Sequence, residues 1–395
     1  MKAVQLNAKW DPKPDFKLGS KDIDGKLSYL GSKVWRHPKV EIVDKPQPSI
    51  GPEDVLIEVK ACGICGSDVH MAQSDDQGYI WYPGLTAFPA VLGHEFAGIV
   101  VKVGERAINK RTGKRYEIGE PLCAEEMFWC GQCRPCCDGY PNHCEALQEI
   151  GFSIDGAYAK YVSVPAKYCW SLAPLRKLYD EKQLFLAGSL VEPGSVAYTA
   201  VIIRAGGIIP GDNVLVLGGG PIGLGACAIL KKAGASHVIL SEPSEGRAEM
   251  AKKLGVTDVI DPTKEDMPER VLSITDGMGA DLILEATGLP TRVWPDIERV
   301  IWEGRTLNAR VAIVARADAK IPMTGEVFQV RRAQVFGSQG HSGDGVFPHV
   351  ISCMGAGMDM TPIITKQISL DEVAENLKLL QTSREHCKIT VTNFD

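Results

Sequence analysis

The chain has 395 residues, enough for two domains, because single hydrophobic cores rarely grow beyond about 250–300 residues. Hydrophobic residues make up 45% and charged residues 23%, as in ordinary globular proteins, and the net charge of −6 argues against nucleic-acid or anionic-membrane partners. No apolar stretch follows Lys2, so we expect no secretory signal and a cytoplasmic location. The uncharged run 214–230 contains five glycines and is interpreted as a strand, turn and helix rather than a membrane span.

The pattern of predicted elements changes along the chain. Short alternating runs such as 54–60 and 96–103, among many Gly and Pro residues, predict a mostly β first domain. From Asn213 onward, buried-type strands alternate with helices, which predicts a parallel sheet with right-handed crossovers. After residue 340 the pattern is mixed, with a helix expected at 371–380. The predicted domains are 1–197, with a cysteine lobe at about 123–147, then 198–340, and a return to the first domain at 341–395.

Several potential metal ligands lie in the first domain. Cys65 follows the predicted strand, the pair His94-Glu95 comes next, and Glu192 lies near the domain boundary. One thiolate, one imidazole and one carboxylate leave a tetrahedral zinc with an open position, as in catalytic sites. A second carboxylate would make the site anionic and a poorer Lewis acid. We therefore expect Cys65 and His94 to be constant ligands, while Glu95 and Glu192 compete for the third place and the loser orients bound water.

Each of these residues alone has an ordinary structural explanation. A single His94 is more often a hydrogen-bonded structural histidine, and Glu95 is more often a surface charge. Ser67 or Asp68 is also a suitable cap for the helix that Val69 begins. The interpretation as a metal site therefore depends on the whole set and on the motifs that follow.

Twelve cysteines are present, and four of them have metal-ligand spacing. In a reducing compartment such clusters bind metal more often than they form disulfides, although a disulfide pair or a cluster of idle thiols is the alternative. Two overlapping CxxC turns and a returning fourth thiolate suit a tetrahedral zinc with no open position, which predicts a structural metal. These four are Cys130, Cys133, Cys136 and Cys144. Apart from Cys65, the remaining seven are interpreted as packed, reduced thiols.

A glycine-rich turn joins the strand 214–217 to a helix. Its sequence is Gly218-Gly219-Gly220-Pro221-Ile222-Gly223, a GxGxxG motif in the strand–turn–helix context that dinucleotide binding requires. The helix amino terminus would bind the pyrophosphate. Glu242, after the next strand, is placed to accept hydrogen bonds from the adenosine ribose and favours NAD over NADP. Arg247 would contact the adenine or tolerate a 2′-phosphate, or it is a surface charge of its helix.

Taken in order, these motifs resemble the zinc-containing medium-chain alcohol dehydrogenase family, over nearly the whole chain. The form Gly66-Ser-Asp-Val-His70, with His94-Glu95 and with Glu192 where the ethanol branch has cysteine, is similar to the sorbitol, butanediol and threonine dehydrogenase branch. The resemblance implies an α/β architecture: a GroES-like catalytic domain, a Rossmann NAD-binding domain, one catalytic and one structural zinc, and a homodimer or homotetramer. Within the branch, inositols and inososes are an attractive substrate class.

Two insertions depart from the family pattern. They lie at about 8–34 and 106–119, and surface decoration is their simplest interpretation. The segment 337–341 also replaces the Arg-Tyr pair expected of sorbitol enzymes, which argues against sorbitol as the substrate. Pocket-lining candidates are Tyr79, Trp81, Tyr82, Phe88 and Phe128, and hydroxyl-binding candidates are Gln339, His341, Ser342 and Asp344.

The expected reaction is oxidation of a secondary hydroxyl to a ketone with hydride transfer to NAD. Zinc would lower the pKa of the hydroxyl, and Ser67 would accept the proton or relay it through the cofactor ribose toward His70. L-threonine and butanediol are the alternative substrates. A non-enzymatic zinc and nucleotide-binding redox sensor and a zinc-ribbon nucleic-acid binder are alternatives of another class; the intact set of potential zinc ligands argues against the sensor.

Overall fold

The computed structural model describes residues 1–317, 319–341, 343 and 345–395, and the chain divides into two compact units. The first unit consists of Met1–Glu192, Ser342–Ile351 and Ile364–Asp395, and the second of Pro193–His341 and Ser352–Ile363. The expected return to the first domain at 341–395 therefore differs in one segment. Ser352–Ile363 stays with the second unit, where the Ala356 carbonyl accepts a hydrogen bond of 2.7 Å from Lys232 Nζ.

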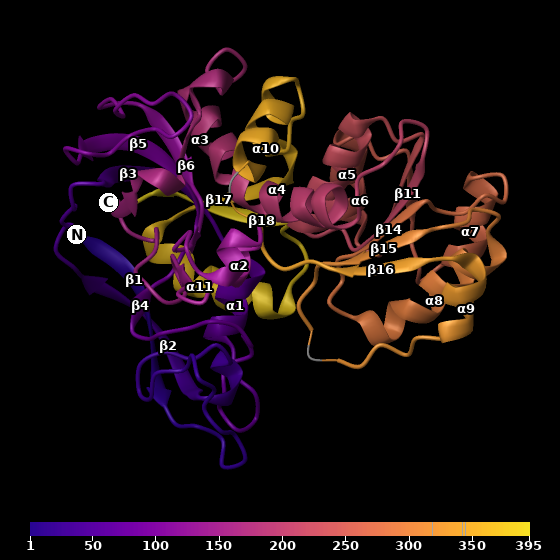
Figure 1. Cartoon of the computed structure of the whole chain (residues 1–395), viewed down its shortest axis with the longest axis horizontal. Coiled ribbons are helices and arrows are strands. Elements are labelled where there is room, and N and C mark those ends of the chain that lie inside the picture. Colours follow the sequence, from indigo (N-terminus) through magenta and orange to yellow (C-terminus); the bar gives the residue numbers. More distant parts are fainter. Residues whose placement is uncertain (318, 342, 344) are drawn as a thin grey trace. The chain divides into compact units, whose positions relative to one another are not determined.

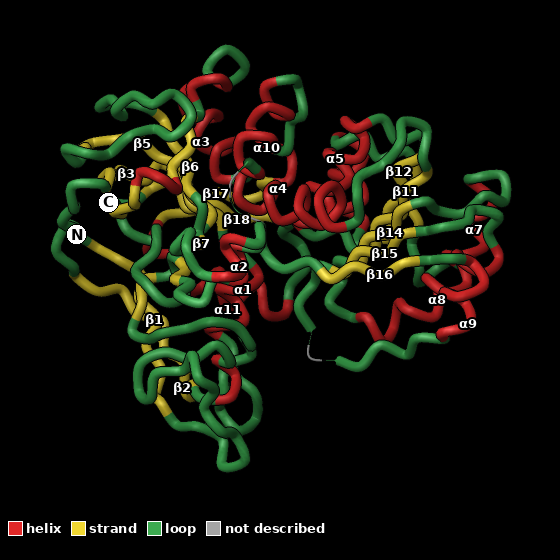
Figure 2. The backbone as a smooth tube through the Cα atoms, in the orientation of Figure 1, coloured by secondary structure: helices red, strands yellow, loops and turns green. Residues whose placement is uncertain are grey.

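The first unit is mostly β-structure, as the alternating runs predict, and its strands pair antiparallel except for β17 and β18, which are parallel (Figures 1 and 2). Along strand β3 (Asp54–Gly63), every second residue from Val55 is buried and faces the core, namely Val55, Ile57 and Val59. The largest sheet has the order β10-β6-β5-β3-β18-β17, with β9 beside β3. Its strands are β3 (Asp54–Gly63), β5 (Glu95–Val103), β6 (Pro121–Ala124), β9 (Tyr161–Pro165), β10 (Cys169–Ser171), β17 (Ile364–Ser369) and β18 (Lys388–Asn393).

Smaller elements complete the first unit. A second sheet contains β1 (Lys2–Trp10), β2 (Trp35–Asp44) and β4 (Ala90–Val91), and a hairpin pairs β7 (Met127–Phe128) with β8 (Gln148–Glu149). The helices are α1 (Gly66–Ala72), α2 (Arg134–Cys137), α3 (Glu181–Ser189) and α11 (Val373–Thr382). The helices α4 (Val191–Tyr198) and α10 (Val346–Gly355) each contain a division between the units.

The second unit contains a six-stranded, fully parallel sheet of order β13-β12-β11-β14-β15-β16. This is the doubly wound Rossmann order, and it confirms the predicted α/β fold class. The strands are β11 (Asn213–Leu217), β12 (His237–Ser241), β13 (Asp258–Ile260), β14 (Leu282–Glu285), β15 (Arg310–Ile313) and β16 (Gln334–Gly337). The helices are α5 (Pro221–Ala233), α6 (Glu245–Lys253), α7 (Met267–Ile274), α8 (Pro290–Glu303) and α9 (Gly325–Arg331), preceded by a π-helix at Thr199–Arg204.

Among the residues that the structure describes, one apolar helical stretch has the length of a membrane span. It runs over Glu181–Arg204, and 78% of its most apolar window is buried inside the structure, as in the core helix of a globular protein. The uncharged run 214–230 instead forms β11 and most of α5, as the sequence predicts.

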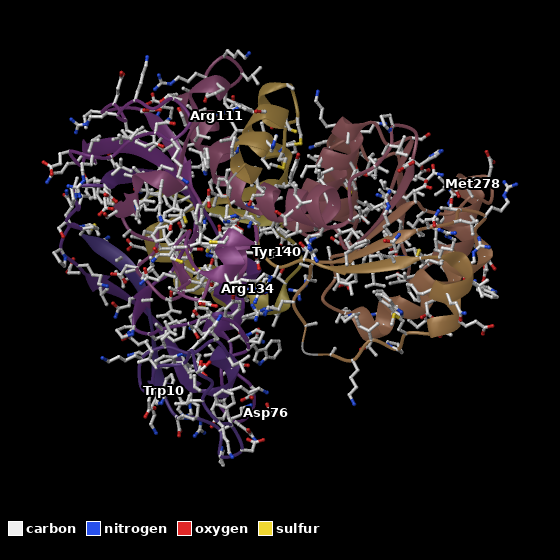
Figure 3. All side chains as sticks on the ribbon, viewed as in Figure 1. Trp10, Asp76, Arg111, Arg134, Tyr140 and Met278 are labelled. Atoms are coloured by element: carbon white, nitrogen blue, oxygen red, sulfur yellow. The ribbon has the colours of Figure 1, made fainter. Side chains whose placement is uncertain are left out.

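The amino-terminal insertion has little regular structure and packs against the first unit through specific contacts. The Trp10 indole donates a hydrogen bond of 2.8 Å to Asp24 and packs edge-on against Trp35, with ring centroids 5.0 Å apart (Figure 3 labels Trp10). Ser28 and Thr86 exchange backbone hydrogen bonds of 3.0 and 2.9 Å. The insertion is therefore joined to the loop that follows α1.

Candidate active site

Helix α1 has Cys65 as its N-cap residue, and Asp68 in its first turn fixes that beginning. The Asp68 carboxylate accepts a hydrogen bond of 3.0 Å from the Cys65 backbone N–H and another of 2.8 Å from the Tyr158 hydroxyl. Asp68 therefore closes a capping box from the third position of the helix, and α1 begins three residues before Val69, where the sequence predicted its start with Ser67 or Asp68 as the cap. Its other oxygen lies 3.7 Å from Nδ1 of His94, so this fully buried carboxylate also faces the imidazole.

His94 is oriented as a metal-binding histidine. While Nδ1 faces Asp68, Nε2 lies 3.5 Å from Ser67 Oγ, and the ring packs against Phe152 at 4.6 Å between centroids. A carboxylate behind one ring nitrogen commonly orients the other toward a metal. Burial alone lowers the pKa of His94, but Asp68 and Cys65 outweigh it and raise the pKa well above its usual value. Zinc binds the unprotonated imidazole, so metal and proton compete for His94.

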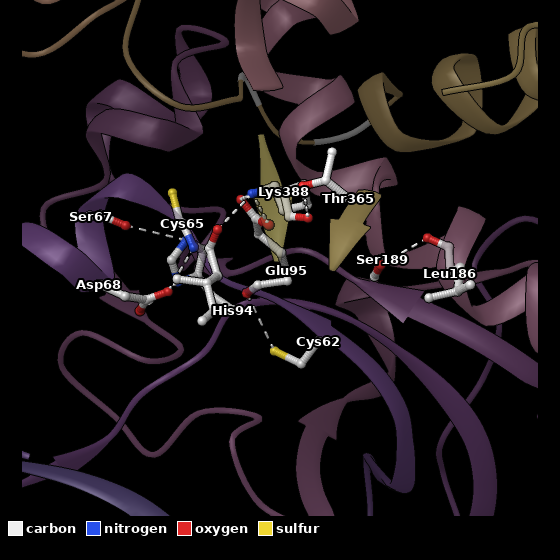
Figure 4. A network of polar contacts seen from close by, with 12 residues as sticks. Cys62, Cys65, Ser67, Asp68, His94, Glu95, Leu186, Ser189, Thr365 and Lys388 are labelled. Carbon is white, nitrogen blue, oxygen red and sulfur yellow. Dashed lines mark hydrogen bonds and ion pairs between the residues drawn. The ribbon is translucent and has the colours of Figure 1, made fainter. Parts of the chain in front are cut away.

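The structure brings Cys65, His94 and Glu95 together, with their potential ligand atoms all within 4.8 Å of one another (Figure 4). A thiolate, an imidazole and a carboxylate are the donors that zinc accepts, so this set fits the metal. Glu192 is not part of that 4.8 Å group among the described residues. It is only 6% exposed, and burial and then the Glu126 charge raise its pKa well above the usual value, while His94 lowers it.

Glu95 has a partner that the sequence did not point to. The Lys388 ammonium donates a hydrogen bond of 2.7 Å to Glu95 Oε1 and one of 2.9 Å to the Ile64 carbonyl (Figure 4). Both side chains of this ion pair are only 1% exposed. Burial lowers the pKa of Lys388, but Glu95 and then Cys65 outweigh it and leave the pKa above its usual value. A Cβ on Gly63 would collide with the Glu95 carboxylate, which explains the glycine at the end of β3.

The four clustered cysteines form a second metal site of different character. The ligand atoms of Cys130, Cys133, Cys136 and Cys144 all lie within 4.8 Å of one another. Backbone N–H groups point at the sulfurs: those of Gln132 and Cys133 lie 3.4 and 3.3 Å from Cys130 Sγ and lower its pKa to about 6. Burial raises the pKa of Cys136 to about 12 and also raises the pKa of Cys144, so the thiolate is favoured at Cys130 and not at every sulfur. Four cysteine ligands with no open position fit a closed, structural zinc.

The glycine turn has the geometry that a dinucleotide requires. Gly218 has a φ of 100°, which a side chain would strain, and a Cβ on Gly223 would collide with the Gly218 carbonyl. Gly220 has open space where its Cβ would be, so a pyrophosphate can approach the backbone, and α5 begins at Pro221, followed by Ile222. The turn therefore has the backbone geometry that the motif predicts.

Glu242 lies directly beside this turn. Its carboxylate accepts hydrogen bonds of 2.6 Å from the Gly219 N–H and 2.8 Å from the Ser244 N–H, and it is only 6% exposed. Arg247 lies 4.0 Å away, at the outer limit of an ion pair. The acid is therefore rigidly held at the end of β12, where the ribose hydroxyls are expected.

The aromatic and polar candidates for the pocket differ in exposure. Tyr79, Phe88 and Phe128 are at most 9% exposed and pack in the interior. Trp81 keeps 50% of its surface exposed, and its ring centroid lies 6.3 Å from that of His70, a residue of α1. The remaining candidates are half-buried Tyr82, exposed Gln339 and buried His341, while Ser342 and Asp344 lie outside the described residues.

Comparisons with known sequences match both units. The alcohol dehydrogenase GroES-like domain matches residues 51–174, and the zinc-binding dehydrogenase family matches residues 221–356. The chain is 66% identical to scyllo-inosose 3-dehydrogenase of Thermotoga maritima over 394 residues, covering 100% of both chains. It is 33% identical to L-threonine 3-dehydrogenase of Caldanaerobacter subterraneus, over 88% of this chain and 94% of that one.

Solved structures agree with the sequence comparisons. A Thermotoga maritima protein described as an alcohol dehydrogenase superposes with a TM-score of 0.97 at 66% identity, covering 99% of this chain and 100% of the other. The 2R,3R-butanediol dehydrogenase of Bacillus subtilis superposes with a TM-score of 0.75 at 27% identity, covering 99% of both. Together with the two family matches, these likenesses confirm the resemblance: the chain belongs to the zinc-containing medium-chain alcohol dehydrogenase family, whose members are zinc-binding, NAD(P)-dependent oxidoreductases.

Proposed function

We propose that the protein oxidises one secondary hydroxyl of an inosose or a related inositol to a ketone, with NAD as hydride acceptor. The observation that carries this proposal is the 66% identity to scyllo-inosose 3-dehydrogenase over the full length of both chains. In the reaction, the carbinol carbon transfers a hydride to the nicotinamide and the hydroxyl proton leaves to solvent, so NADH, a ketone and one proton are formed.

The residues of the first unit support this chemistry. Cys65, His94 and one of the acids Glu95 and Glu192 would hold the catalytic zinc, which when bound supplies a Lewis acid that lowers the pKa of a hydroxyl group. Ser67, beside His94 Nε2, is placed to accept a proton from the substrate side of the cluster. The other zinc would be structural, held by the four clustered cysteines.

His70 is the proposed outer member of the proton relay. It follows Ser67 by three residues on α1, a spacing that places both on one face of the helix. Desolvation and then the positive charge of Arg384 lower the pKa of His70 below its usual value. Both effects favour the uncharged imidazole, which is the form that can accept a proton.

The experiment that tests the substrate is a panel followed by NADH absorbance: scyllo-inosose, myo-inositol, sorbitol, 2,3-butanediol and L-threonine. We expect kcat/KM for the cyclic substrates to exceed that for threonine by at least about 100-fold, because polar groups that bind the ring hydroxyls are left unpaired by an acyclic amino acid. The 33% identity to a threonine dehydrogenase makes threonine the second candidate. A higher kcat/KM for threonine or butanediol than for both scyllo-inosose and myo-inositol would reject the proposal.

The preference for NAD rests on Glu242. Replacing Glu242 by Ala should weaken the binding of NAD more than the binding of NADP. The variant loses the acceptor for the ribose hydroxyls, and it also loses the negative charge that repels a 2′-phosphate. We expect the ratio of kcat/KM for NAD to that for NADP to fall about 10–100-fold, the effect of losing hydrogen bonds to a charged group. The matched control is Glu245→Ala, an exposed acid in the first turn of α6, which should leave the ratio unchanged. An unaltered protein that prefers NADP would contradict the assignment.

We also propose a cytoplasmic enzyme that forms homodimers or homotetramers. No disulfide joins the cysteines of the described residues, as expected in a reducing compartment. Family membership leaves the two non-enzymatic alternatives, a redox sensor and a zinc-ribbon nucleic-acid binder, without support.

A further inference from the structure

The ion pair between Lys388 and Glu95 is a buried charge pair that includes one of the candidate zinc ligands. It joins two strands that are far apart in sequence, because the pair spans 293 positions. Strand β18 pairs with the end of β3, with Val391 opposite Cys62 and Thr390 opposite Gly63. The Ile64 N–H continues this pairing by donating to the Ile389 carbonyl at 2.8 Å. This register brings Lys388 beside the backbone that leads directly into Cys65.

The Lys388 ammonium is held on two sides. It donates to Glu95 and to the Ile64 carbonyl, and its stem passes close to Gly63. Neither side chain of the pair has access to bulk water that would screen its charge, since both are only 1% exposed. Any metal bound by Cys65 and His94 therefore lies near a fixed positive charge as well as near the Glu95 carboxylate.

That positive charge bears directly on the chemistry of the site. Zinc(II) with one thiolate and two carboxylates has a net negative charge, which makes it a poorer Lewis acid. An ammonium group bound to one of the two carboxylates returns the cluster to neutrality without removing either acid. A buried lysine thus offers a way to keep both Glu95 and Glu192 beside the metal.

We propose that Lys388 is a positioning residue of the catalytic metal site: it holds the Glu95 carboxylate beside Cys65 and His94 and offsets its charge, so that zinc stays a strong Lewis acid between two buried acids. The inference rests on the proposed function, because it requires that Cys65 and His94 hold zinc. It also predicts that replacing Lys388 and replacing Glu95 change the zinc affinity in opposite directions, which an ordinary structural ion pair would not show.

The test is a set of three variants, with zinc affinity measured by competition with a chromogenic chelator. Lys388→Met removes the positive charge and leaves Glu95 free to attract the metal, so zinc should bind at least about tenfold more tightly. Glu95→Gln leaves Lys388 uncompensated, so zinc should bind at least about tenfold more weakly. The double variant Lys388→Met/Glu95→Gln removes both charges and should return the affinity to within about threefold of the unaltered protein.

A second readout separates the electrostatic role from a structural one. In Lys388→Met, the rising limb of the kcat–pH profile should move to higher pH by about one unit, although zinc is bound more tightly, because the metal site is more negative. The matched control is Lys366→Met on the neighbouring strand β17, whose ammonium bonds to Asn376 away from the cluster. It should leave both the zinc affinity and the profile unchanged.

The test remains decisive even if the unpaired Glu95 carboxylate in Lys388→Met prevents folding. In that case the double variant is compared with Glu95→Gln, and the proposal requires tighter zinc binding in the double variant. Weaker zinc binding in both single variants would show an ordinary structural ion pair and overturn the inference. The unaltered protein is measured first: if it contains a single zinc per chain, the proposed function fails, whereas two zincs with no effect of Lys388→Met reject only the role of Lys388.

Discussion

Replacing Cys65 by Ser is expected to abolish turnover while the protein stays folded. The thiol is half-buried at the amino terminus of α1 and belongs to the cluster with His94 and Glu95. A neutral hydroxyl is a much poorer zinc ligand than a thiolate, so the variant should lose the metal from this site. Metal-ion catalysis contributes several kcal/mol, and a loss of about 4 kcal/mol lowers kcat/KM about 1000-fold.

Three measurements on one preparation check this result: kcat/KM, zinc per chain by elemental analysis, and the thermal unfolding midpoint. We expect zinc to fall from two per chain to one, with the midpoint lowered by only a few degrees. Cys353→Ser, a similar half-buried thiol outside both clusters, is the control and should keep both zincs and full activity. If Cys65→Ser keeps two zincs and its turnover, or loses both zincs and unfolds, the two metal sites do not have separate roles.

The parts of this site that could be predicted are those whose geometry is local. The segment 218–223 has its function within one turn, and the structure shows the positive φ of Gly218 and the close approach at Gly223 that the spacing requires. The four clustered cysteines also lie within fifteen residues, so their spacing alone limits how far apart the sulfurs can lie. In both cases the backbone between the residues is too short to allow another arrangement.

The parts that could not be predicted depend on strand register across the whole chain. Lys388 reaches Glu95 only because β18 inserts between β3 and β17, and nothing in the local sequence Cys387-Lys388-Ile389 distinguishes this lysine from a surface residue. The buried carboxylate of Asp68 was recognised only as a possible helix cap, although it also faces His94 at 3.7 Å. A lysine within an apolar carboxy-terminal strand was the available signal, because unpaired lysines are almost never fully buried.

The choice between Glu95 and Glu192 shows the same limit. From sequence the two acids were equivalent candidates for one position, and a charge argument allowed only one of them. The structure places Glu95 in the ligand group and Glu192 close enough to the same residues for their charges to affect its pKa. Lys388 changes the charge argument itself, because with a buried ammonium present two acids no longer require an anionic site.

The second large effect is expected for Cys144→Ser, which should destabilise the protein and remove the other zinc. Cys144 is 1% exposed and lies in a small apolar cluster with Leu85, Met127 and Leu147. Four buried residues form too small a core to hold a lobe that contains only the short α2 and a few turns, so the metal must supply most of its stability. Leu27 and Tyr29 of the amino-terminal insertion pack against this same cluster.

Zinc bound by cysteine-rich peptides contributes about 10–16 kcal/mol, and a lobe attached to a folded unit should lose only part of that. A loss of about 4 kcal/mol corresponds to a fall of roughly 10 °C in the unfolding midpoint for a unit of this size. Calorimetry and elemental analysis check both values, with Cys137→Ser as the control, because Cys137 is exposed and adjacent to Cys136 but outside the ligand group. An unchanged midpoint with two zincs retained in Cys144→Ser would mean that Cys144 is not a ligand of the structural zinc. The two variants should therefore have different effects, because separate metals serve separate tasks. Cys65→Ser should lose activity at nearly full stability, whereas Cys144→Ser should lose stability while its folded fraction still turns over substrate.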